Sequence, residues 1–227
     1  MTNFSKHTIA TIVALFFHIV GLIGILYIDQ KWFSDLTVYN LLLSFGLLLW
    51  TQSEKNVPFF LFLISAVVIG FVSELIGVNT ALLFGEYQYG ANLGMQWKGV
   101  PLVIGVNWFI IVYCSGITIT TLLQKIVERN GEASSDPSTI IKTLSVVVDG
   151  ATLAVLFDWI MESVAVKLNY WKWLSADIPL FNYLCWFLIS AILLILFRML
   201  KFNKQNKFAI HLFLIQLMFF LLLRTFL

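Results

Sequence analysis

Four carboxylic acids lie within long apolar runs of the sequence, where such groups are uncommon. Glu74 is near the end of one run, and Asp149, Asp158 and Glu162 lie together in another. An Asp at the centre of a membrane-spanning helix costs about 2.5–3.5 kcal/mol on insertion scales, so its presence needs a reason. Asp158 and Glu162 are four residues apart, so a helix presents both on one face. We expect functional roles for Glu74 and Asp158.

The other two acids have structural alternatives. Glu162 is close to the predicted helix end and could reach the membrane surface or pair with Lys167. Asp149 lies nine residues before Asp158, about half a helical turn away around the axis, so it points elsewhere. A structural pairing with a neighbouring helix is therefore the preferred role for Asp149.

Acids in an apolar, aromatic-lined pocket favour one type of reaction. Loss of solvent keeps a carboxyl group protonated at neutral pH, so that it can donate a proton. Such a group could protonate an electron-rich alkene, and the faces of Trp and Tyr rings would stabilise the resulting cation. A second carboxylate or a Tyr could orient the water that captures the cation. This chemistry needs no cofactor.

A second group of polar residues lies in the segment that follows Glu74. The connection 78–98 is rich in Gly, Tyr and Asn, which predicts a structured, re-entrant cap with tight turns. Glu86, Tyr87 and Tyr89 lie at its centre. The alternative for the tyrosines is an aromatic belt at the membrane interface.

Further aromatic and amide side chains come from two more places. Asn107 and Trp108 lie within the next apolar run, where Asn often joins helices through hydrogen bonds. Trp171 and Trp173 follow the run that contains Asp158, and interfacial anchoring is their simplest role. All four are candidate substrate-binding residues, together with Tyr87 and Tyr89.

The elements that must position these residues are membrane-spanning helices. The chain is 60% hydrophobic and 11% charged, whereas soluble domains carry about 25% charged residues. A span needs about 20 mostly apolar residues. Seven segments qualify: 7–28, 36–52, 58–78, 99–123, 139–166, 179–200 and 208–226. The sequence predicts an all-α polytopic bundle of about seven helices, or six if the short segment 36–52 does not span.

The Lys and Arg residues predict the orientation. With the N-terminus inside, nine of them fall on inner segments and five on outer segments, which favours an inside N-terminus and an outside C-terminus. We expect one integral membrane domain over 1–227, in a bacterial inner (cytoplasmic) membrane. The stretch 128–138 is predicted to be a flexible loop. The halves of the chain show no internal repeat of the kind found in many transporters.

Several classes of function lack support in the sequence. The net charge of +2 and the absence of a basic stripe argue against nucleic-acid binding. The three His and two Cys are scattered without metal-ligand spacing, so no metal site is predicted. The chain also has no GxSxG nucleophile and no phosphate-binding Gly-rich loop.

Beyond these patterns, the sequence resembles a known family. The resemblance rests on Glu74-x-x-Gly77, Thr80, FGEYQYG at 84–90, Leu93-Gly94, GVPL at 99–102 and Asn107-Trp108. These motifs are similar to those of the carotenoid biosynthesis protein family, which includes carotenoid 1′,2′-hydratases and bisanhydrobacterioruberin hydratases. Asp158 and the motif Trp171-Lys172-Trp173 extend the resemblance, which covers roughly residues 60–200. Two positions depart from the family pattern: Glu162-Ser163 replaces an Asp-Pro pair, and Ala81 replaces a Gly.

The resemblance implies hydration of the terminal ψ-end double bond of an acyclic or monocyclic carotenoid, giving a tertiary alcohol. Asp158 or Glu74 would donate the proton, and Glu162 or Glu86 would orient water. The implied partners are a polyene from the bilayer and other carotenoid-pathway enzymes. We expect Glu74 and Asp158 to meet in a chamber large enough for a prenyl tip.

Two alternatives from other functional classes stay open. Intramembrane acids are also typical of small proton-coupled transporters. A non-catalytic partner that binds carotenoid for other enzymes would need the same apolar surroundings.

Overall fold

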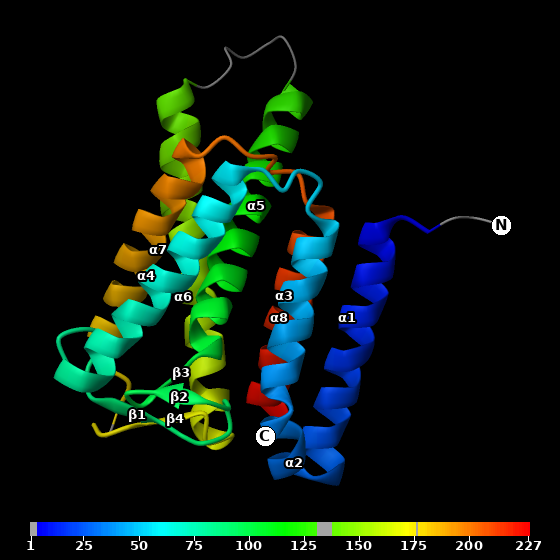
Figure 1. Ribbon diagram of the computed structural model, residues 1–227. Coiled ribbons are helices and arrows are strands. Elements are labelled where there is room, and N and C mark those ends of the chain that lie inside the picture. The colour runs from blue at the N-terminus through cyan, green and yellow to red at the C-terminus, as the bar shows by residue number, and fades with distance from the viewer. Residues whose placement is uncertain (1–3, 131–137, 176) are drawn as a thin grey trace.

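The chain forms a bundle of transmembrane helices, seen in a computed structural model that describes residues 4–130, 138–175 and 177–227. Within these ranges seven helical segments are long and apolar enough to cross a membrane, which confirms the predicted fold class. Figure 1 shows them in order: α1 (Lys6–Ile23) with η1 (Gly24–Ile28), α2 (Gln30–Asp35) with α3 (Thr37–Thr51), α4 (Val57–Thr80), α5 (Val103–Asn130), α6 (Thr139–Lys167), α7 (Leu180–Met199) and α8 (Lys207–Phe226).

Capping residues and prolines define several helix starts. The Asn56 side chain accepts a hydrogen bond from the Phe59 N–H (3.1 Å), and Pro58 lies in the first turn of α4, where no amide proton is needed. Pro179 is the N-cap residue of α7. Pro101 lies two residues before α5, in a short strand. Pro137 lies outside the described residues.

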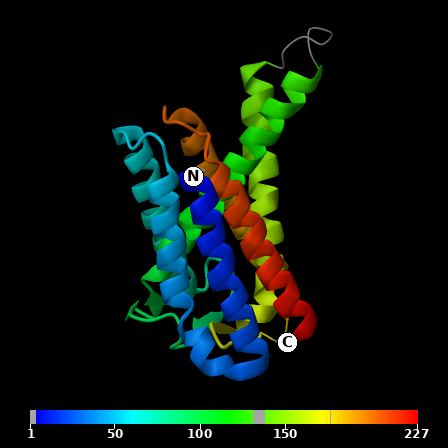
Figure 2. The same cartoon turned by 90° about the vertical axis from the view of Figure 1, so that its right-hand side faces the viewer.

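Helix α5 is the centre of the bundle. Most of its side chains are buried, and it packs against α3, α4, α6, α7 and α8. With 28 and 29 residues, α5 and α6 are each about 42 Å long, and their ends project beyond the other helices in Figure 2. Residues 128–130 of the predicted loop 128–138 belong to α5. Residues 131–137 are outside the described ranges, and Ser138 caps α6.

A glycine brings α4 close to α5 next to the acid of α4. A Cβ at Gly70 would lie 2.3 Å from the Trp108 ring, so only glycine leaves room for this indole. The close approach allows Trp108, on α5, to reach Glu74, which lies one turn beyond Gly70 on α4.

Four short strands close one end of the bundle. They are β1 (Tyr87–Tyr89), β2 (Gln96–Trp97), β3 (Val100–Pro101) and β4 (Trp171–Trp173), at the bottom of Figure 1. β1 pairs antiparallel with β4, and β2 pairs antiparallel with β3. The sequence did not predict these strands, because each is only two or three residues long and the β1–β4 partners are more than 80 positions apart.

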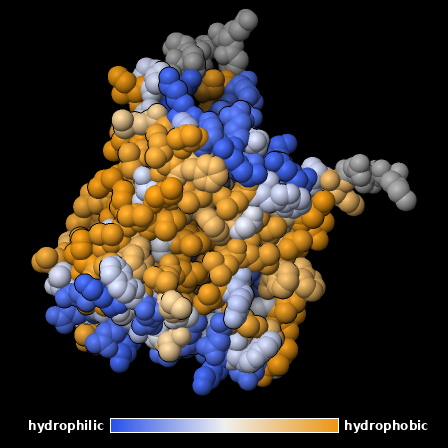
Figure 3. Space-filling model, viewed as in Figure 1, coloured by the Kyte–Doolittle hydropathy of each residue, from blue (hydrophilic) through white to orange (hydrophobic). Residues whose placement is uncertain are grey.

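The surface has the character of an integral membrane protein. In Figure 3 a broad apolar belt covers the middle of the molecule, and hydrophilic residues gather at both ends. Many large apolar side chains are exposed on this belt, including Ile64 and Ile192. Lipid is the solvent that such a surface requires.

Candidate active site

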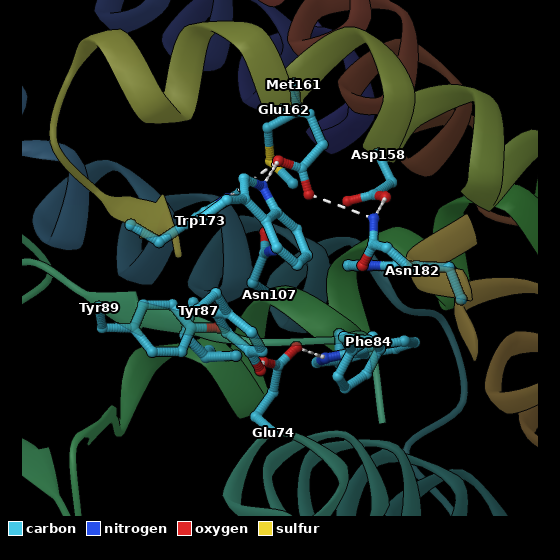
Figure 4. Close-up of a pocket in the computed structure, with 14 residues that line it drawn as sticks. Glu74, Phe84, Tyr87, Tyr89, Asn107, Asp158, Met161, Glu162, Trp173 and Asn182 are labelled. Atoms are coloured by element: carbon cyan, nitrogen blue, oxygen red, sulfur yellow. Dashed lines mark hydrogen bonds between the residues drawn. The ribbon is translucent and has the colours of Figure 1, made fainter. Parts of the chain in front are cut away.

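The acids of α4 and α6 meet in one small cavity. It has a volume of about 30 Å³, room for a water molecule, and lies between α4, α5, α6 and α7 under the β1–β4 ribbon. Figure 4 shows the acids of the two helices facing each other across it. The lining residues are Glu74, Phe84, Tyr87, Tyr89, Ile104, Asn107, Trp108, Asp158, Met161, Glu162, Trp171, Trp173, Asn182 and Trp186.

The β1–β4 ribbon supplies four aromatic side chains to the cavity. Tyr87 is paired with Trp173 and Tyr89 with Trp171. Because side chains alternate along a strand, these four residues share the face of the ribbon that lines the cavity. The ribbon therefore brings the two aromatic motifs of the sequence together.

Glu74 is surrounded by hydrogen-bond donors. It is 4% exposed. The Tyr87 hydroxyl donates to Oε2, the Tyr89 hydroxyl donates to Oε2 at 2.7 Å, and the Trp108 indole N–H donates to Oε1 at 3.0 Å. Burial, reinforced by the Glu74 charge, raises the pKa of both tyrosines, so the hydroxyl groups keep their protons and act as donors. Both oxygens of Glu74 are thus occupied.

Glu162 is held in the same way from the other side. It is 2% exposed. The indole N–H groups of Trp171 and Trp173 both donate to Oε2 at 3.0 Å, and the Asn182 amide donates to Oε1 at 3.3 Å. Indole and amide N–H groups can only donate, so Glu162 acts as an acceptor in all three bonds. Lys167, the alternative partner considered from the sequence, is exposed.

Asp158 differs from the other two acids because one of its oxygens has no partner. It is 1% exposed. Its Oδ2 accepts a hydrogen bond from Asn182 Nδ2 (2.8 Å), and its Oδ1 is buried without any hydrogen-bond partner. The same Asn182 amide nitrogen also reaches Glu162, so Asn182 bridges the two acids of α6. Unpartnered buried oxygens are uncommon and need an explanation.

The walls of the cavity are suited to positive charge. Trp108 and Trp186 stack with ring centroids 3.9 Å apart and an interplanar angle of 13°. Among the described residues that line the cavity there are three carboxyl groups and neither Lys nor Arg. Aromatic faces and carboxylates both attract a cation. Within the described ranges, no three His, Cys, Asp or Glu side chains form a group that could hold a metal ion.

One of the predicted site residues lies elsewhere. Glu86 is exposed and does not line the cavity, because it directly precedes β1, whose inward positions are Tyr87 and Tyr89. The other predicted catalytic and binding residues, Glu74, Asp158, Glu162, Tyr87, Tyr89, Asn107, Trp108, Trp171 and Trp173, all line it.

Two further expectations differ from the structure. The cavity is much smaller than a chamber for a prenyl tip, because aromatic rings fill the space between the acids. Asp149 is exposed and accepts a hydrogen bond from Ser145 of its own helix, so it is not paired with a neighbouring helix.

Five lining residues were not predicted from the sequence: Phe84, Ile104, Met161, Asn182 and Trp186. Asn182 could have been predicted as a site residue, since it is an amide within the apolar run of α7, as Asn107 is within α5. Trp186 is one turn farther along α7 on the same face. Phe84 and Met161 could not be distinguished from ordinary core residues.

Comparison with known proteins identifies relatives but no structural template. The sequence model described as "Carotenoid biosynthesis protein" matches residues 36–227. A bisanhydrobacterioruberin hydratase from Haloarcula japonica is 28% identical over 128 residues, which cover 55% of this chain and 39% of that protein. The chain thus matches well under half the length of this relative. No solved structure matches the chain. The family match covers most of the sequence, and the chain belongs to the carotenoid biosynthesis protein family.

Proposed function

We propose that the protein is a cofactor-independent hydratase that adds water to the terminal ψ-end double bond of an acyclic or monocyclic carotenoid. The observation that carries this proposal is the buried, unpartnered Oδ1 of Asp158, beside two acids whose oxygens are all occupied. Of the three acids, Asp158 alone has an oxygen available to a reacting group. Asp158 is therefore the proton donor.

The reaction begins with proton transfer from the Asp158 carboxyl group to the terminal alkene. The alkene π electrons form the new C–H bond at the less substituted carbon, and a tertiary cation remains at the other carbon. A water molecule then forms a C–O bond to this cation. One proton of that water returns to the Asp158 carboxylate, so the net change is the addition of one water molecule.

The cation is stabilised by the fixed surroundings of the cavity. Glu74 supplies negative charge held in place by Tyr87, Tyr89 and Trp108. The stacked Trp108 and Trp186 rings supply polarisable faces. Such preorganised groups do not need to reorient as the charge develops.

The size of the cavity fits the smaller reactant. A volume of about 30 Å³ holds a water molecule between polar groups but not a branched prenyl end. We infer that this is the position of the reacting water, with Asn182 holding Asp158 and Glu162 one turn apart beside it. The prenyl end then enters next to the water.

The orientation in the membrane follows from the charge bias. With the N-terminus inside and the C-terminus outside, the β1–β4 ribbon and the cavity lie toward the outer face. The polyene would arrive from the bilayer, and other carotenoid-pathway enzymes would act before and after this protein. A bacterial inner membrane stays a prediction, since the hydratase relative is archaeal.

Expression in a carotenoid-producing bacterium, followed by mass analysis of the pigments, tests the proposal. We expect the wild-type chain to add the mass of one water per reacting end. Asp158→Asn should lower conversion by about 10²–10⁴-fold, the usual contribution of a general acid. Asp149→Asn is the matched control, because Asp149 is exposed on the same helix. Its conversion should equal that of the wild type.

Two results would contradict the proposal. Full conversion by folded Asp158→Asn would remove Asp158 from the role of proton donor. Unchanged pigment with the wild-type chain would remove the hydratase assignment. Proton or solute flux in proteoliposomes would then support a transporter, and retained but unmodified pigment a carotenoid-binding partner.

A further inference from the structure

A large apolar hollow lies among the N-terminal helices of the bundle. It has a volume of about 540 Å³ and is formed by α1, η1, α2, α3 and one residue of α8. Five of its lining residues are aromatic: Phe17, Trp32, Phe33, Tyr39 and Phe219. We call it the α1–α3 hollow. Its volume is in the range of pockets that bind small molecules.

We propose that the α1–α3 hollow binds the conjugated chain of the carotenoid whose end reacts at the carboxylate cavity. This inference rests on the function proposed above and extends it by a second binding site. The carboxylate cavity, at about 30 Å³, has no space for the chain of its substrate, so another surface must hold that chain.

The lining favours a polyene over a lipid acyl chain. A conjugated chain is flat, rigid and polarisable, and therefore gains from contact with aromatic rings such as Phe17 and Phe33. It also loses little conformational freedom on binding, whereas an acyl chain must give up many rotamers. The same hollow therefore discriminates between the two kinds of apolar chain.

Hydrogen bonds and ring contacts connect the hollow to the carboxylate cavity. Thr37, which lines the hollow, shares a hydrogen bond of 2.5 Å with the Tyr170 hydroxyl. The Tyr170 ring lies 6.5 Å from the ring of Trp171, which lines the cavity and donates to Glu162. Tyr170 and Trp171 therefore form a chain of contacts between the two sites, along which one long molecule would extend to present its end to the acids.

One wall of the hollow is specific to the N-terminal part of this chain. The family model begins at residue 36, so α1, η1 and α2 precede the matched region. They contribute Phe17, Trp32 and Phe33 to the hollow. We therefore assign part of the recognition of the polyene chain to the first 35 residues, and the reaction to the matched part.

Filling the hollow tests the inference. A Cβ at Gly21 first meets Phe219 at 3.7 Å, an ordinary contact, so Gly21→Leu should place a side chain in the hollow and reduce its volume. Gly46→Leu is the matched control, because Gly46 is exposed on α3 with nothing within 4 Å of its added Cβ. Lycopene is the probe, and its induced circular dichroism in purified, lipid-reconstituted protein reports binding. Gly21→Leu should weaken lycopene binding at least tenfold, and Gly46→Leu should leave it unchanged.

The possible results separate this inference from the proposed function. If Gly21→Leu binds lycopene and hydrates polyenes as the wild type does, the inference is wrong and the hydratase assignment stands. If Gly21→Leu loses binding but even the wild type adds no water, the inference stands and the hydratase assignment fails. Should Gly21→Leu misfold, Val20→Phe adds a ring to the hollow from the same helix, and the same results apply.

Discussion

The two ends of the helix bundle each bury a cluster of polar side chains, and the two clusters are built differently. The carboxylate cavity, at the β1–β4 end, contains Glu74, Asp158 and Glu162. The opposite end contains what we call the neutral cluster: Thr51, Gln52, Tyr113 and Asn206, which are all buried. Both clusters join helices that are distant in the sequence.

Hydrogen bonds between uncharged groups hold the neutral cluster together. The Tyr113 hydroxyl donates to Gln52 Oε1 (2.5 Å), and Gln52 Nε2 donates to the Asn203 carbonyl (2.8 Å). Asn206 Nδ2 donates to the Thr51 and Tyr113 hydroxyl groups, each at 3.2 Å. These bonds tie the end of α3 to the middle of α5 and to the loop before α8. Such polar contacts are the usual means of fixing helices in a membrane.

The two clusters differ in whether they contain carboxyl groups, and this difference separates a structural role from a chemical one. A neutral network fixes helix ends without placing charge in a medium of low dielectric constant. The carboxylate cavity concentrates three acids around a water-sized space, which architecture alone does not require. Burial of polar groups is thus common to both ends, and carboxyl groups are found only in the cluster where we propose that the reaction takes place.

Among the substitutions that test this difference between the two ends, Glu74→Gln is expected to have the largest effect on the rate of hydration. The substitution keeps the shape of the side chain and removes the negative charge that faces the developing cation. We expect the rate of hydration per folded protein to fall by about 10²–10³-fold, the range observed when one preorganised electrostatic group is lost. Pigment conversion over time measures this rate.

Glu86→Gln provides the matched control for Glu74→Gln. Glu86 is exposed and outside the cavity, so its substitution should leave the rate within twofold of the wild type, about 0.4 kcal/mol. Equal losses for both variants would mean that the position of the charge in the cavity does not matter. That result would contradict the distinction between the two ends.

A smaller effect is expected when the same hydroxyl group is removed at each end. Tyr87→Phe leaves Glu74 with two donors and a less fixed position, so the rate should fall roughly ten- to a hundredfold. Tyr113→Phe leaves Gln52 Oε1 without its donor. It should lower the free energy of unfolding by about 1–3 kcal/mol and leave the rate of the folded protein unchanged. Thermal unfolding and pigment conversion, measured on both variants, test the pair.

The reverse pattern would contradict the distinction between the two ends of the bundle. If Tyr113→Phe lowered the rate of hydration and left the free energy of unfolding unchanged, the neutral cluster would have a part in the reaction. If Tyr87→Phe kept the wild-type rate, the hydrogen-bond donors of Glu74 would have a structural role only.

Much of the fold was predictable because each span is a long apolar segment. The seven helices follow from hydrophobicity, and the starts of α4 and α7 coincide with Pro58 and Pro179. The β1–β4 ribbon was not predictable, because three-residue strands carry little local preference and pair through contacts between distant segments.

The site was predictable where the residue types were unusual for their surroundings. Glu74, Asp158 and Glu162 stood out as acids in apolar runs, and all three line the cavity. Trp186 and Phe84 did not stand out, because an aromatic residue in a membrane helix or its connection is ordinary. The direction of Glu86 depended on strand alternation that the sequence did not reveal.

The smallest predicted effect concerns Lys204, which lies beside the neutral cluster between α7 and α8. Burial, with a minor effect of Arg198, lowers the pKa of Lys204 to about 8, and its ammonium group lies over the Phe202 ring at 4.3 Å. In an unfolded chain the pKa of Lys is about 10.4. Between these two values the unfolded chain binds more protons than the folded protein, so the stability of the fold rises with pH in this window. Thermal unfolding midpoints measured across the window should rise for the wild type.

Lys204→Met should remove this rise, because the side chain keeps its apolar length and loses the titrating group. Lys201→Met, on an exposed neighbour in the same loop, should keep it. The rate of hydration in the folded protein should follow the wild type in both variants, since neither lysine lines the carboxylate cavity. A change in rate with Lys204→Met would connect the two ends of the bundle through α7 and end their separation into a structural and a reactive region.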